Sequence, residues 1–216
     1  MPLFDGLTVT ADVAAIVRPG WLAVDNVTVV DRDARMDEPL RAAAAALRPM
    51  AQSADAASDP TSSAVRTMYK KVGLDPTKTR PSSEALFRRI ARGDELPRIN
   101  SLVDIINWSS AESRLPYGLY DLDQIRGPVT LRVGQPGEEY AGIRKEVVHV
   151  GGRLVLADEH GPFGNPTSDS ARTMTTARTT RALVVIFAPV SVPASASDRA
   201  LALTRERIDR YCVKGS

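Results

Sequence analysis

The feature that most constrains the fold of this 216-residue chain is one uninterrupted apolar run, Ala182 to Val190 (ALVVIFAPV). A run without alternating polar residues is typical of a strand that is buried on both faces. It is much shorter than the ~18 apolar residues expected of a membrane-spanning helix. The sequence therefore predicts a sheet at the centre of the protein, with helices packed on it.

The first 63 residues are expected to form a small α/β lobe. Residues 21–30 alternate like a strand, and an Ala-rich helix is predicted from Pro39 to about Arg48. Residues 51–63 (AQSADAASDPTSS) are small and polar, which is typical of a linker. We expect residues 1–63 to be part of the same domain as the segment that follows.

The remaining chain is expected to form a core over residues 64–190 and a C-terminal helix, within residues 191–216, that packs on it. Ser63 is suited to cap the first core helix, and Pro81 to open the second. From residue 127 the pattern becomes β, and Gly151-Gly152 between two apolar runs predicts a hairpin. This order of elements predicts an α+β protein whose central sheet is mixed or antiparallel.

Composition excludes several classes of protein. The single cysteine, Cys212, rules out a disulfide framework, and with only His149 and His160 it cannot complete a Cys/His zinc site. The sequence contains no nucleophile elbow, P-loop or dinucleotide-binding glycine motif. We therefore expect no metal and no cofactor, no membrane partner, and a cytoplasmic location.

Basic charge is concentrated in one segment, since residues 64–100 carry 9 basic and 4 acidic side chains. Such a segment can contact the phosphates of a nucleic acid, or it can be a pair of solvated amphipathic helices. For the first alternative we expect contacts from Lys70, Lys71, Lys78, Arg80, Arg88 and Arg89.

A short helix predicted over residues 99–108 carries a narrow polar stripe. At 100° per residue, Asn100, Asp104 and Asn107 lie within about 60° of one another, and apolar residues cover the other side. The stripe is either an ordinary solvated face or the wall of a polar pocket, in which amides and a carboxylate fix a ligand.

Residues 167–180 (TSDSARTMTTARTT) form the other unusual segment, because eight of these fourteen residues are Ser or Thr. Hydroxyls donate and accept hydrogen bonds, so a cluster can orient a water molecule or an amino group, and Arg172 can hold a phosphate. The alternative is a flexible polar loop that leads into the apolar strand.

Residues 80–140 resemble the B3/B4 domain, the tRNA-editing module of the bacterial phenylalanyl-tRNA synthetase beta chain, and more closely the free-standing proteins that carry this module alone. The resemblance covers about residues 65–187. It is carried in order by Arg80-Pro81-Ser82, Glu84-Ala85-Leu86, Leu96-Pro97, Ile99-Asn100, Leu102-Val103-Asp104, Asn107, Leu115-Pro116, Gly118, Tyr120-Asp121-Leu122-Asp123, Gly127, Leu131-Arg132, Gly137-Glu138, Leu156-Ala157-Asp158, Asp169-Ser170, Thr173 and Thr179.

The resemblance implies an α+β fold and a pocket that accepts the aminoacyl end of a mischarged tRNA and hydrolyses its ester. Gly118 and Ile106 stand where the synthetase module has a His and a Thr, so that module's tyrosine selectivity does not carry over. The pocket residues that the resemblance and the two polar segments imply are Asn100, Asn107, Pro116, Gly118, Asp121, Ser168, Thr176 and Thr179.

Two functions from different classes follow. The first is a trans-acting aminoacyl-tRNA editing factor, in which Ser170, Thr173 and Asp104 take part in catalysis and Arg172 joins the basic segment in binding tRNA. The partner would be the aminoacylated 3′ end of tRNA, with no role for DNA. The second is a non-catalytic module of the same fold that binds tRNA, another RNA or a small ligand.

Overall fold

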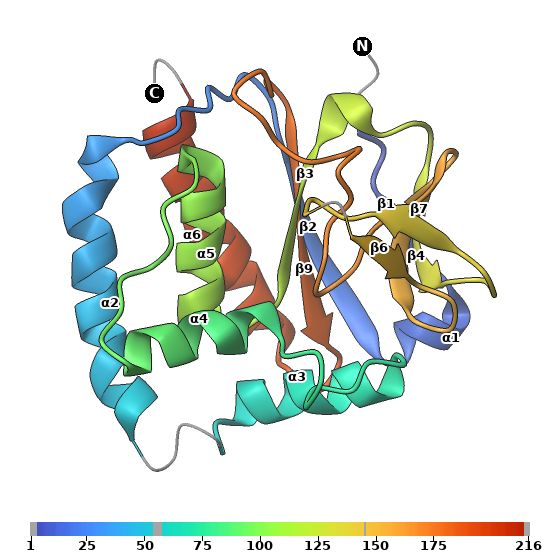
Figure 1. Cartoon of the computed structure of the whole chain (residues 1–216), viewed down its shortest axis with the longest axis horizontal. Helices are drawn as coiled ribbons and strands as arrows, with labels where there is room; N and C mark the ends of the chain where they lie inside the picture. The colour runs from blue at the N-terminus through green and yellow to red at the C-terminus, as the bar shows by residue number, and fades with distance from the viewer. Residues whose placement is uncertain (1–3, 54–57, 145, 214–216) are drawn as a thin grey trace.

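The computed structural model describes residues 4–53, 58–144 and 146–213. Its elements form three layers (Figure 1). A three-stranded sheet with the order β2-β9-β3 lies in the middle. Most of the helices gather on one side of it, and a four-stranded sheet with the order β1-β4-β7-β8 lies on the other.

The central sheet is built around β9 (Ala182–Pro189), in which every residue is buried. β9 pairs antiparallel with β2 (Val17–Val24) on one side and with β3 (Tyr117–Asp121) on the other. Neighbouring strands occupy both edges of β9 and other layers cover its faces, so the prediction of a strand buried on both faces is confirmed.

The N-terminal strand lies earlier in the chain than the sequence pattern suggested. β2 begins at Val17 and ends at Val24, not at Val30. Asn26 adopts a left-handed backbone conformation with φ of 58°, which turns the chain out of the sheet. The apolar residues Val27 and Val29 are buried beyond this turn, and their burial produces the alternation that resembles a longer strand.

The second sheet contains β1 (Leu7–Val9), β4 (Val129–Val133), β7 (Leu154–Asp158) and β8 (Gly161–Gly164). β1 runs parallel to β4, and the other two pairings are antiparallel, so this sheet is mixed. A separate antiparallel pair joins β5 (Glu139–Ala141) to β6 (Val147–His149).

The predicted hairpin across Gly151-Gly152 is wrong. β6 pairs with β5, whereas β7 pairs with β4 and β8. The glycines do form a tight turn, in which Arg153 N–H donates to the carbonyl of Val150 at 3.0 Å. Gly151 also bridges to Gly134, and Gly152 N–H donates to the carbonyl of Gly134, so the turn packs on another loop and does not join two paired strands. A Cβ at Gly134 would lie 2.1 Å from the carbonyl oxygen of Val150, so this close approach needs glycine.

Six α-helices and two 3₁₀ turns complete the described part of the chain. They are α1 (Ala11–Ala14), α2 (Asp37–Gln52), α3 (Pro60–Lys71), α4 (Ser82–Ala91), α5 (Ser101–Ser113), α6 (Ala194–Cys212), η1 (Ala34–Met36) and η3 (Leu122–Gln124). These helices and the mixed and antiparallel sheets confirm the α+β class. In the part of the chain that the structure describes, no helix is long and apolar enough to cross a membrane.

Two helices begin at caps that differ from the sequence expectation. α3 begins at Pro60 because the Asp59 carboxylate accepts a hydrogen bond from Ser62 N at 2.8 Å, so Ser63 lies inside the helix. α5 begins after Asn100, whose Oδ1 accepts from Val103 N at 2.9 Å. Asn100 therefore lies at the cap of this helix and not on its face.

The first part of the chain contributes directly to the core. β2 is an edge strand of the central sheet, and α2 packs against α4 and α5. α6 packs against α5 and contacts β2 and β9, so the C-terminal helix covers the same sheet (Figure 1).

Candidate functional site

A cavity of about 390 Å³ lies between α4, α5, β3 and the segment that follows β8. Its apolar lining includes Leu86, Val103, Ile106, Leu119 and Met174, and most of its other lining residues carry amides or hydroxyls. The complete lining is Ser82, Leu86, Ile99, Asn100, Val103, Ile106, Asn107, Ser110, Tyr117, Leu119, Ile143, Asn165, Pro166, Thr167, Asp169, Met174 and Thr175.

Helix α5 brings two of the predicted polar residues to this cavity. Asn100 reaches it from the cap, with its Oδ1 committed to the first turn of the helix. Asn107 lies two turns further along, inside the helix, and does not cap a helix end. Part of the predicted polar stripe is therefore a cavity wall and not a solvated face.

The turn at Asn165 also lines the cavity and is fixed by hydrogen bonds. Asn165 Oδ1 accepts from Thr167 N at 2.8 Å and from Ser168 N at 2.9 Å. Asn165 Nδ2 donates to Tyr140 Oη at 2.9 Å, and Tyr140 Oη donates to the carbonyl of Ser168 at 2.5 Å. Tyr69 Oη adds a bond to the carbonyl of Pro166 at 2.8 Å. This turn holds Thr167, and Asp169 two residues later, at the cavity.

The Tyr120 side chain fills the space between two glycines beneath this wall. A Cβ at Gly118 would lie 2.1 Å from Tyr120 Oη, and a Cβ at Gly164 would lie 2.3 Å from the same atom. The ring packs edge-on against Phe163, with 5.0 Å between centroids. No side chain fits at position 118 while Tyr120 occupies this place, because contacts that short do not occur between non-bonded atoms.

Asp169 is the titratable side chain at the cavity with the most unusual surroundings. Burial raises the pKa of its carboxyl to about 7, and a Tyr120 hydroxyl and the backbone of Leu119 only partly oppose this effect. Asp169 Oδ1 and Tyr120 Oη are both sealed from solvent, and neither makes a hydrogen bond of full geometry. Asp169 is also one of the residues that line the cavity.

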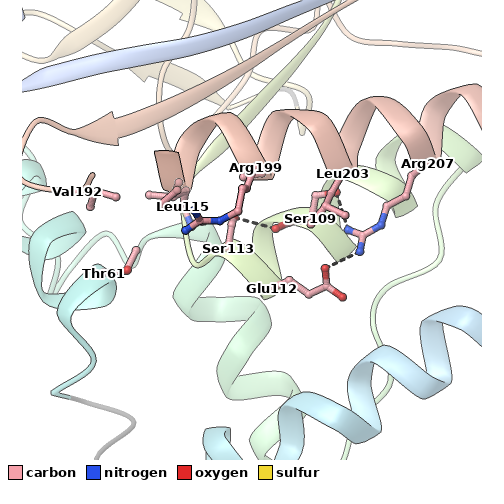
Figure 2. Close-up of a pocket in the computed structure, with 11 residues that line it drawn as sticks. Thr61, Ser109, Glu112, Ser113, Leu115, Val192, Arg199, Leu203 and Arg207 are labelled. Atoms are coloured by element: carbon pink, nitrogen blue, oxygen red, sulfur yellow. Dashed lines mark hydrogen bonds and ion pairs between the residues drawn. The ribbon is translucent and has the colours of Figure 1, made fainter. Parts of the chain in front are cut away.

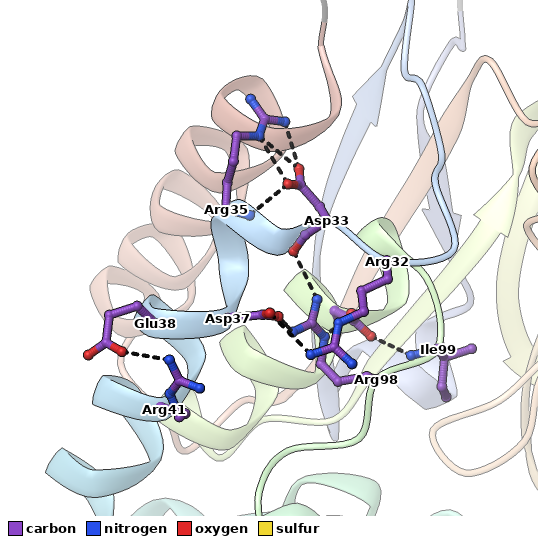
Figure 3. Close-up of polar contacts among 9 residues, drawn as sticks. Arg32, Asp33, Arg35, Asp37, Glu38, Arg41, Arg98 and Ile99 are labelled. Atoms are coloured by element: carbon purple, nitrogen blue, oxygen red, sulfur yellow. Dashed lines mark hydrogen bonds and ion pairs between the residues drawn. The ribbon is translucent and has the colours of Figure 1, made fainter.

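Asp104, predicted as a catalytic residue, does not line the cavity. It is fully buried, its Oδ2 accepts from Arg98 Nε at 2.7 Å, and its Oδ1 accepts from Ile99 N at 2.7 Å. Arg98 continues this network to the Asp37 carboxylate and to the carbonyl of Asp33 (Figure 3). Both Asp104 oxygens are therefore used to fix the start of α5 against α2.

The other two predicted catalytic residues, Ser170 and Thr173, are also turned into the protein. Ser170 is buried, and its Oγ accepts from Arg172 N at 3.1 Å. Thr173 is fully buried, its carbonyl accepts from Asp121 N at 2.8 Å, and its Oγ1 has no hydrogen-bond partner. Neither side chain is part of the lining of this cavity.

Most of the predicted pocket residues likewise hold the surrounding loops. Thr179 Oγ1 donates to Asp121 Oδ2 at 2.7 Å and accepts from Thr176 N at 2.9 Å. Ser168 belongs to the Asn165 turn, and the carbonyl of Pro116 accepts from Phe187 N at 3.0 Å. The predicted pocket residues outside the cavity lining are Pro116, Gly118, Asp121, Ser168, Thr176 and Thr179.

The basic residues predicted to bind tRNA fall into two groups. Three are exposed at the end of α3 and in the loop after it, and no ion pair is found for them among the described residues; we call Lys70, Lys71 and Lys78 the lysine group. The arginines are engaged. Arg80 and Arg88 pair with Glu84 at 3.6 and 3.0 Å, and Arg89 Nε donates to the carbonyl of Glu95.

Arg172, also predicted to bind tRNA, is ion-paired within the protein. Its two terminal nitrogens each lie 2.9 Å from a different oxygen of the Asp158 carboxylate, in a bidentate pair. It also donates to the carbonyl of Gln124 at 3.0 Å. These contacts join the segment after β8 to the end of β7, so we assign Arg172 a structural role.

A second cavity, of about 220 Å³, lies between α5 and α6 (Figure 2). Its main charged side chain, Arg207, pairs with Glu112, donates to Ser109 Oγ at 3.0 Å and stacks 3.8 Å above the Trp108 ring. These partners satisfy the guanidinium within the protein. The cavity at Asp169 is larger and leaves a buried carboxyl uncompensated, so we take it as the candidate site.

The family model described as "B3/4 domain" matches residues 64–212. The chain belongs to the B3/4 domain family. The match covers about two thirds of the chain, including every residue that lines the candidate cavity, and it confirms the family resemblance seen in the sequence.

Similar curated proteins are beta subunits of phenylalanine–tRNA ligase. The Bartonella henselae subunit is 38% identical over 64 residues, covering 29% of this chain and 8% of that protein. The Brucella abortus subunit is 31% identical over 86 residues, covering 39% of this chain and 11% of its own length. The chain thus spans about a tenth of the length of these relatives.

The match among solved structures is more distant. It is an N-terminal fragment of the phenylalanyl-tRNA synthetase beta subunit from Pyrococcus horikoshii, with a TM-score of 0.43 and 17% identity. The alignment covers 51% of this chain and 40% of that chain.

Sequence reasoning missed Asp169 as a site residue, although it noted this residue within the hydroxyl-rich segment. The available signal was an acidic residue between two hydroxyls, four residues after Asn165 in a segment otherwise rich in Thr and Arg. Among the residues that the structure describes, no group of three or more His, Cys, Asp or Glu side chains is placed to hold a metal ion.

Proposed function

We propose that this protein is a trans-acting aminoacyl-tRNA deacylase, which hydrolyses the ester between an amino acid and the 3′ end of a mischarged tRNA. The observation that carries the proposal is the 390 Å³ cavity in the B3/4 domain, whose lining combines apolar side chains with amides, hydroxyls and a carboxyl. Relatives named as beta subunits of phenylalanine–tRNA ligase support a tRNA substrate.

The cavity has the size and lining that an aminoacyl group requires. Small-molecule sites are typically ~300–1,000 Å³, mostly apolar, with a few polar groups that fix orientation. The apolar wall, with Val103, Ile106 and Met174, would hold an apolar side chain of the amino acid. Asn107 and Thr175 would orient the ester and the terminal ribose by hydrogen bonds.

The chemistry needs no strong nucleophile, because the aminoacyl ester is already activated. A water molecule attacks the ester carbonyl, the bond from the carbonyl carbon to the ribose oxygen breaks, and that oxygen takes up a proton. The products are the free amino acid and a tRNA with a free 3′-terminal hydroxyl. The Thr167 and Thr175 hydroxyls can position the water, and the neighbouring ribose hydroxyl can relay the proton; holding reactants in place is itself a large part of catalysis.

The lysine group would bind the phosphates next to the reacting end. Lys78 stands four residues before Ser82, which lines the cavity, and Tyr69 ties α3 to the turn at Pro166. Positive charge and cavity wall are therefore held on one short stretch of chain. Ammonium groups without internal partners can exchange counterions for phosphate contacts.

The test is a deacylation screen with tRNAs mischarged with different amino acids. With the best substrate, Thr167→Val and Thr175→Val are expected to slow single-turnover hydrolysis by about 10–100-fold, because each removes the hydroxyl of a residue that lines the cavity. Ser170→Ala and Thr173→Val are the matched controls, since they remove hydroxyls that do not. Equal rates in all four variants would separate the cavity from catalysis.

A second function is favoured by one specific feature of the lining. The cavity contains no His, Cys or Lys, so it lacks the side chains most often used as a nucleophile or general base. A module that binds aminoacyl-tRNA without hydrolysing it would fit the same geometry, and fold alone does not decide between the two. Binding of a non-hydrolysable analogue without turnover of any ester in the screen would identify this second function.

A further inference from the structure

The ionisable groups of the cavity can give it a negative charge but not a positive one. Among the lining residues, only Asp169 and Tyr117 can ionise by losing a proton. Burial raises the pKa of Tyr117, so its phenol remains neutral near pH 7. A phosphate or carboxylate in this cavity would meet no cationic side chain, whereas a cation would meet one carboxylate.

The protein leaves the Asp169 carboxylate without a cation of its own. The titratable groups that act on it are two tyrosines, Tyr120 from β3 and Tyr140 from β5. Tyr140 already donates its hydroxyl to the carbonyl of Ser168, and Arg172, three residues further along the chain, is held in its bidentate pair with Asp158. A buried carboxylate in this position is costly unless a ligand supplies the opposite charge.

We propose that Asp169 binds the α-ammonium group of the substrate's aminoacyl moiety, so that the site accepts esters with a free amine and rejects N-acylated ones such as formylated or peptidyl esters. This inference rests on the proposed function and names its substrate class. The ammonium would lie against Asp169 while an apolar side chain packs on Val103, Ile106 and Met174 across the cavity.

Acylation of the amine removes the interaction in two ways. It replaces a cation by a neutral amide, and it adds bulk at the wall where the Asn165 turn is fixed by its hydrogen bonds. A hydrogen bond that involves a charged group is worth about 1.5–3 kcal/mol, so the loss of the ammonium corresponds to about 10–100-fold in affinity.

The same contact predicts how binding depends on pH. Asp169 must be ionised, and its pKa lies at about 7 in the free protein because of burial. The ligand amine must be protonated, and α-amines have a pKa of about 7.7–8.0. Affinity is therefore greatest between these two values. It falls by up to about tenfold per pH unit on the acid side as Asp169 takes up a proton, and again on the alkaline side as the amine loses one.

The experiment uses 3′-aminoacylamino-3′-deoxyadenosines, in which an amide replaces the ester, with Leu, Ile, Met, Phe and Tyr side chains. Each probe is compared with its N-acetyl derivative. Binding to the full chain is measured by calorimetry from about pH 5.5 to about pH 9, a range that spans both titrations. The variants are Asp169→Asn and, as a matched control, Asp198→Asn, which changes an exposed carboxylate on α6.

We expect the wild-type protein to bind at least one free-amine probe about 10–100-fold more tightly than its N-acetyl derivative near pH 7.5. Asp169→Asn should remove this preference and, with it, both limbs of the pH profile, because an uncharged amide neither titrates nor favours an ammonium over a neutral amine. Asp198→Asn should behave like the wild type. The inference is overturned if the wild-type protein binds the free-amine and N-acetyl members of every probe pair equally well. It is also overturned if a folded Asp169→Asn variant still prefers the free-amine probe.

The experiments can distinguish failure of the Asp169 inference from failure of the proposed deacylase function. Hydrolysis of mischarged tRNAs with equal rates for free and N-acetylated amines would keep the deacylase and remove the role of Asp169. Amine-dependent binding without hydrolysis of any ester would keep the role of Asp169 and identify a binding module. Absence of binding for every probe, at concentrations at which the protein stays folded, overturns both.

Discussion

Asp169→Asn should make the folded protein more stable at pH 8. The wild-type carboxyl has a pKa of about 7 in the folded protein, raised by burial from an ordinary value of 3.8. Because the folded-state pKa lies above the unfolded-state value, the unfolded chain ionises first as the pH rises. The folded state therefore loses stability between about pH 4 and about pH 7, and the loss is complete above that range. An Asn side chain does not ionise and escapes this loss.

The magnitude follows from the size of the shift. A displacement from 3.8 to about 7 corresponds to about 4 kcal/mol for full ionisation, because each pKa unit is worth about 1.4 kcal/mol. The Asn amide is still a buried polar group without assured partners, which costs about 1–3 kcal/mol. We therefore expect a net gain of about 2 kcal/mol at pH 8, or about 4–8 °C in Tm for a chain of this length.

The assay is thermal and urea denaturation of both proteins at pH 8 and at pH 5. At pH 5 the folded wild-type carboxyl is protonated. The wild type should therefore recover about half or more of the unfolding free energy that it loses at pH 8, and the stability difference between the variant and the wild type should shrink. Asp198→Asn, at an exposed position, should change stability little at either pH. An advantage of equal size at both pH values, or a variant that is less stable than the wild type at pH 8, would refute the reasoning and indicate that Asp169 has a compensating partner.

Three further predictions follow from the packing and the charge distribution. Arg98→Ala should lower the unfolding free energy measured in urea by about 3–5 kcal/mol, because it leaves the Asp104 carboxylate buried and unpaired. As a control, Arg92→Ala removes an exposed ion pair and should lower it by at most about 1 kcal/mol. Gly118→Ala should cost about 1–3 kcal/mol in thermal denaturation, because its Cβ would lie 2.1 Å from Tyr120 Oη; a variant as stable as the wild type would contradict this packing. Replacing the lysine group by Ala should lower the slope of log affinity for tRNA against log salt by about 2–3 in fluorescence anisotropy, and an unchanged slope would place tRNA elsewhere.

The parts of the fold that could be predicted from the sequence are those that depend on local pattern. Ala182–Pro189 is apolar at every position, and no other arrangement buries such a strand as well as the middle of a sheet does. Strand pairing depends on distant residues. The glycines at 151 and 152 looked like a hairpin turn because nothing nearby reveals that Gly134 lies against them.

The same distinction explains which site residues could be found. A helical wheel gives the angle between Asp104 and Asn107, but not which of them faces a cavity. The Asp104 carboxylate does not face the cavity because it accepts a hydrogen bond from the Arg98 guanidinium at the start of the helix. In the hydroxyl-rich segment, composition shows many hydrogen-bonding groups, but the structure commits most of them to the loop itself, as Thr179 does with Asp121.

Position 118 cannot carry a side chain while the Tyr120 hydroxyl occupies the place of its Cβ. Residues two apart on a strand project to the same face, and Tyr120 lies back along β3 so that its hydroxyl occupies the place of a Cβ at Gly118. Any histidine at 118 would require Tyr120 to leave the pocket that Gly164 and Phe163 form around it. From β3 only Tyr117 and Leu119 line the cavity, and the carboxyl of the lining comes from the chain after β8, at Asp169, which the Tyr120 hydroxyl approaches from β3. Glycine at 118 and aspartate at 169 are thus two parts of one arrangement, and a variant that restores a side chain at 118 should also disturb the titration of Asp169.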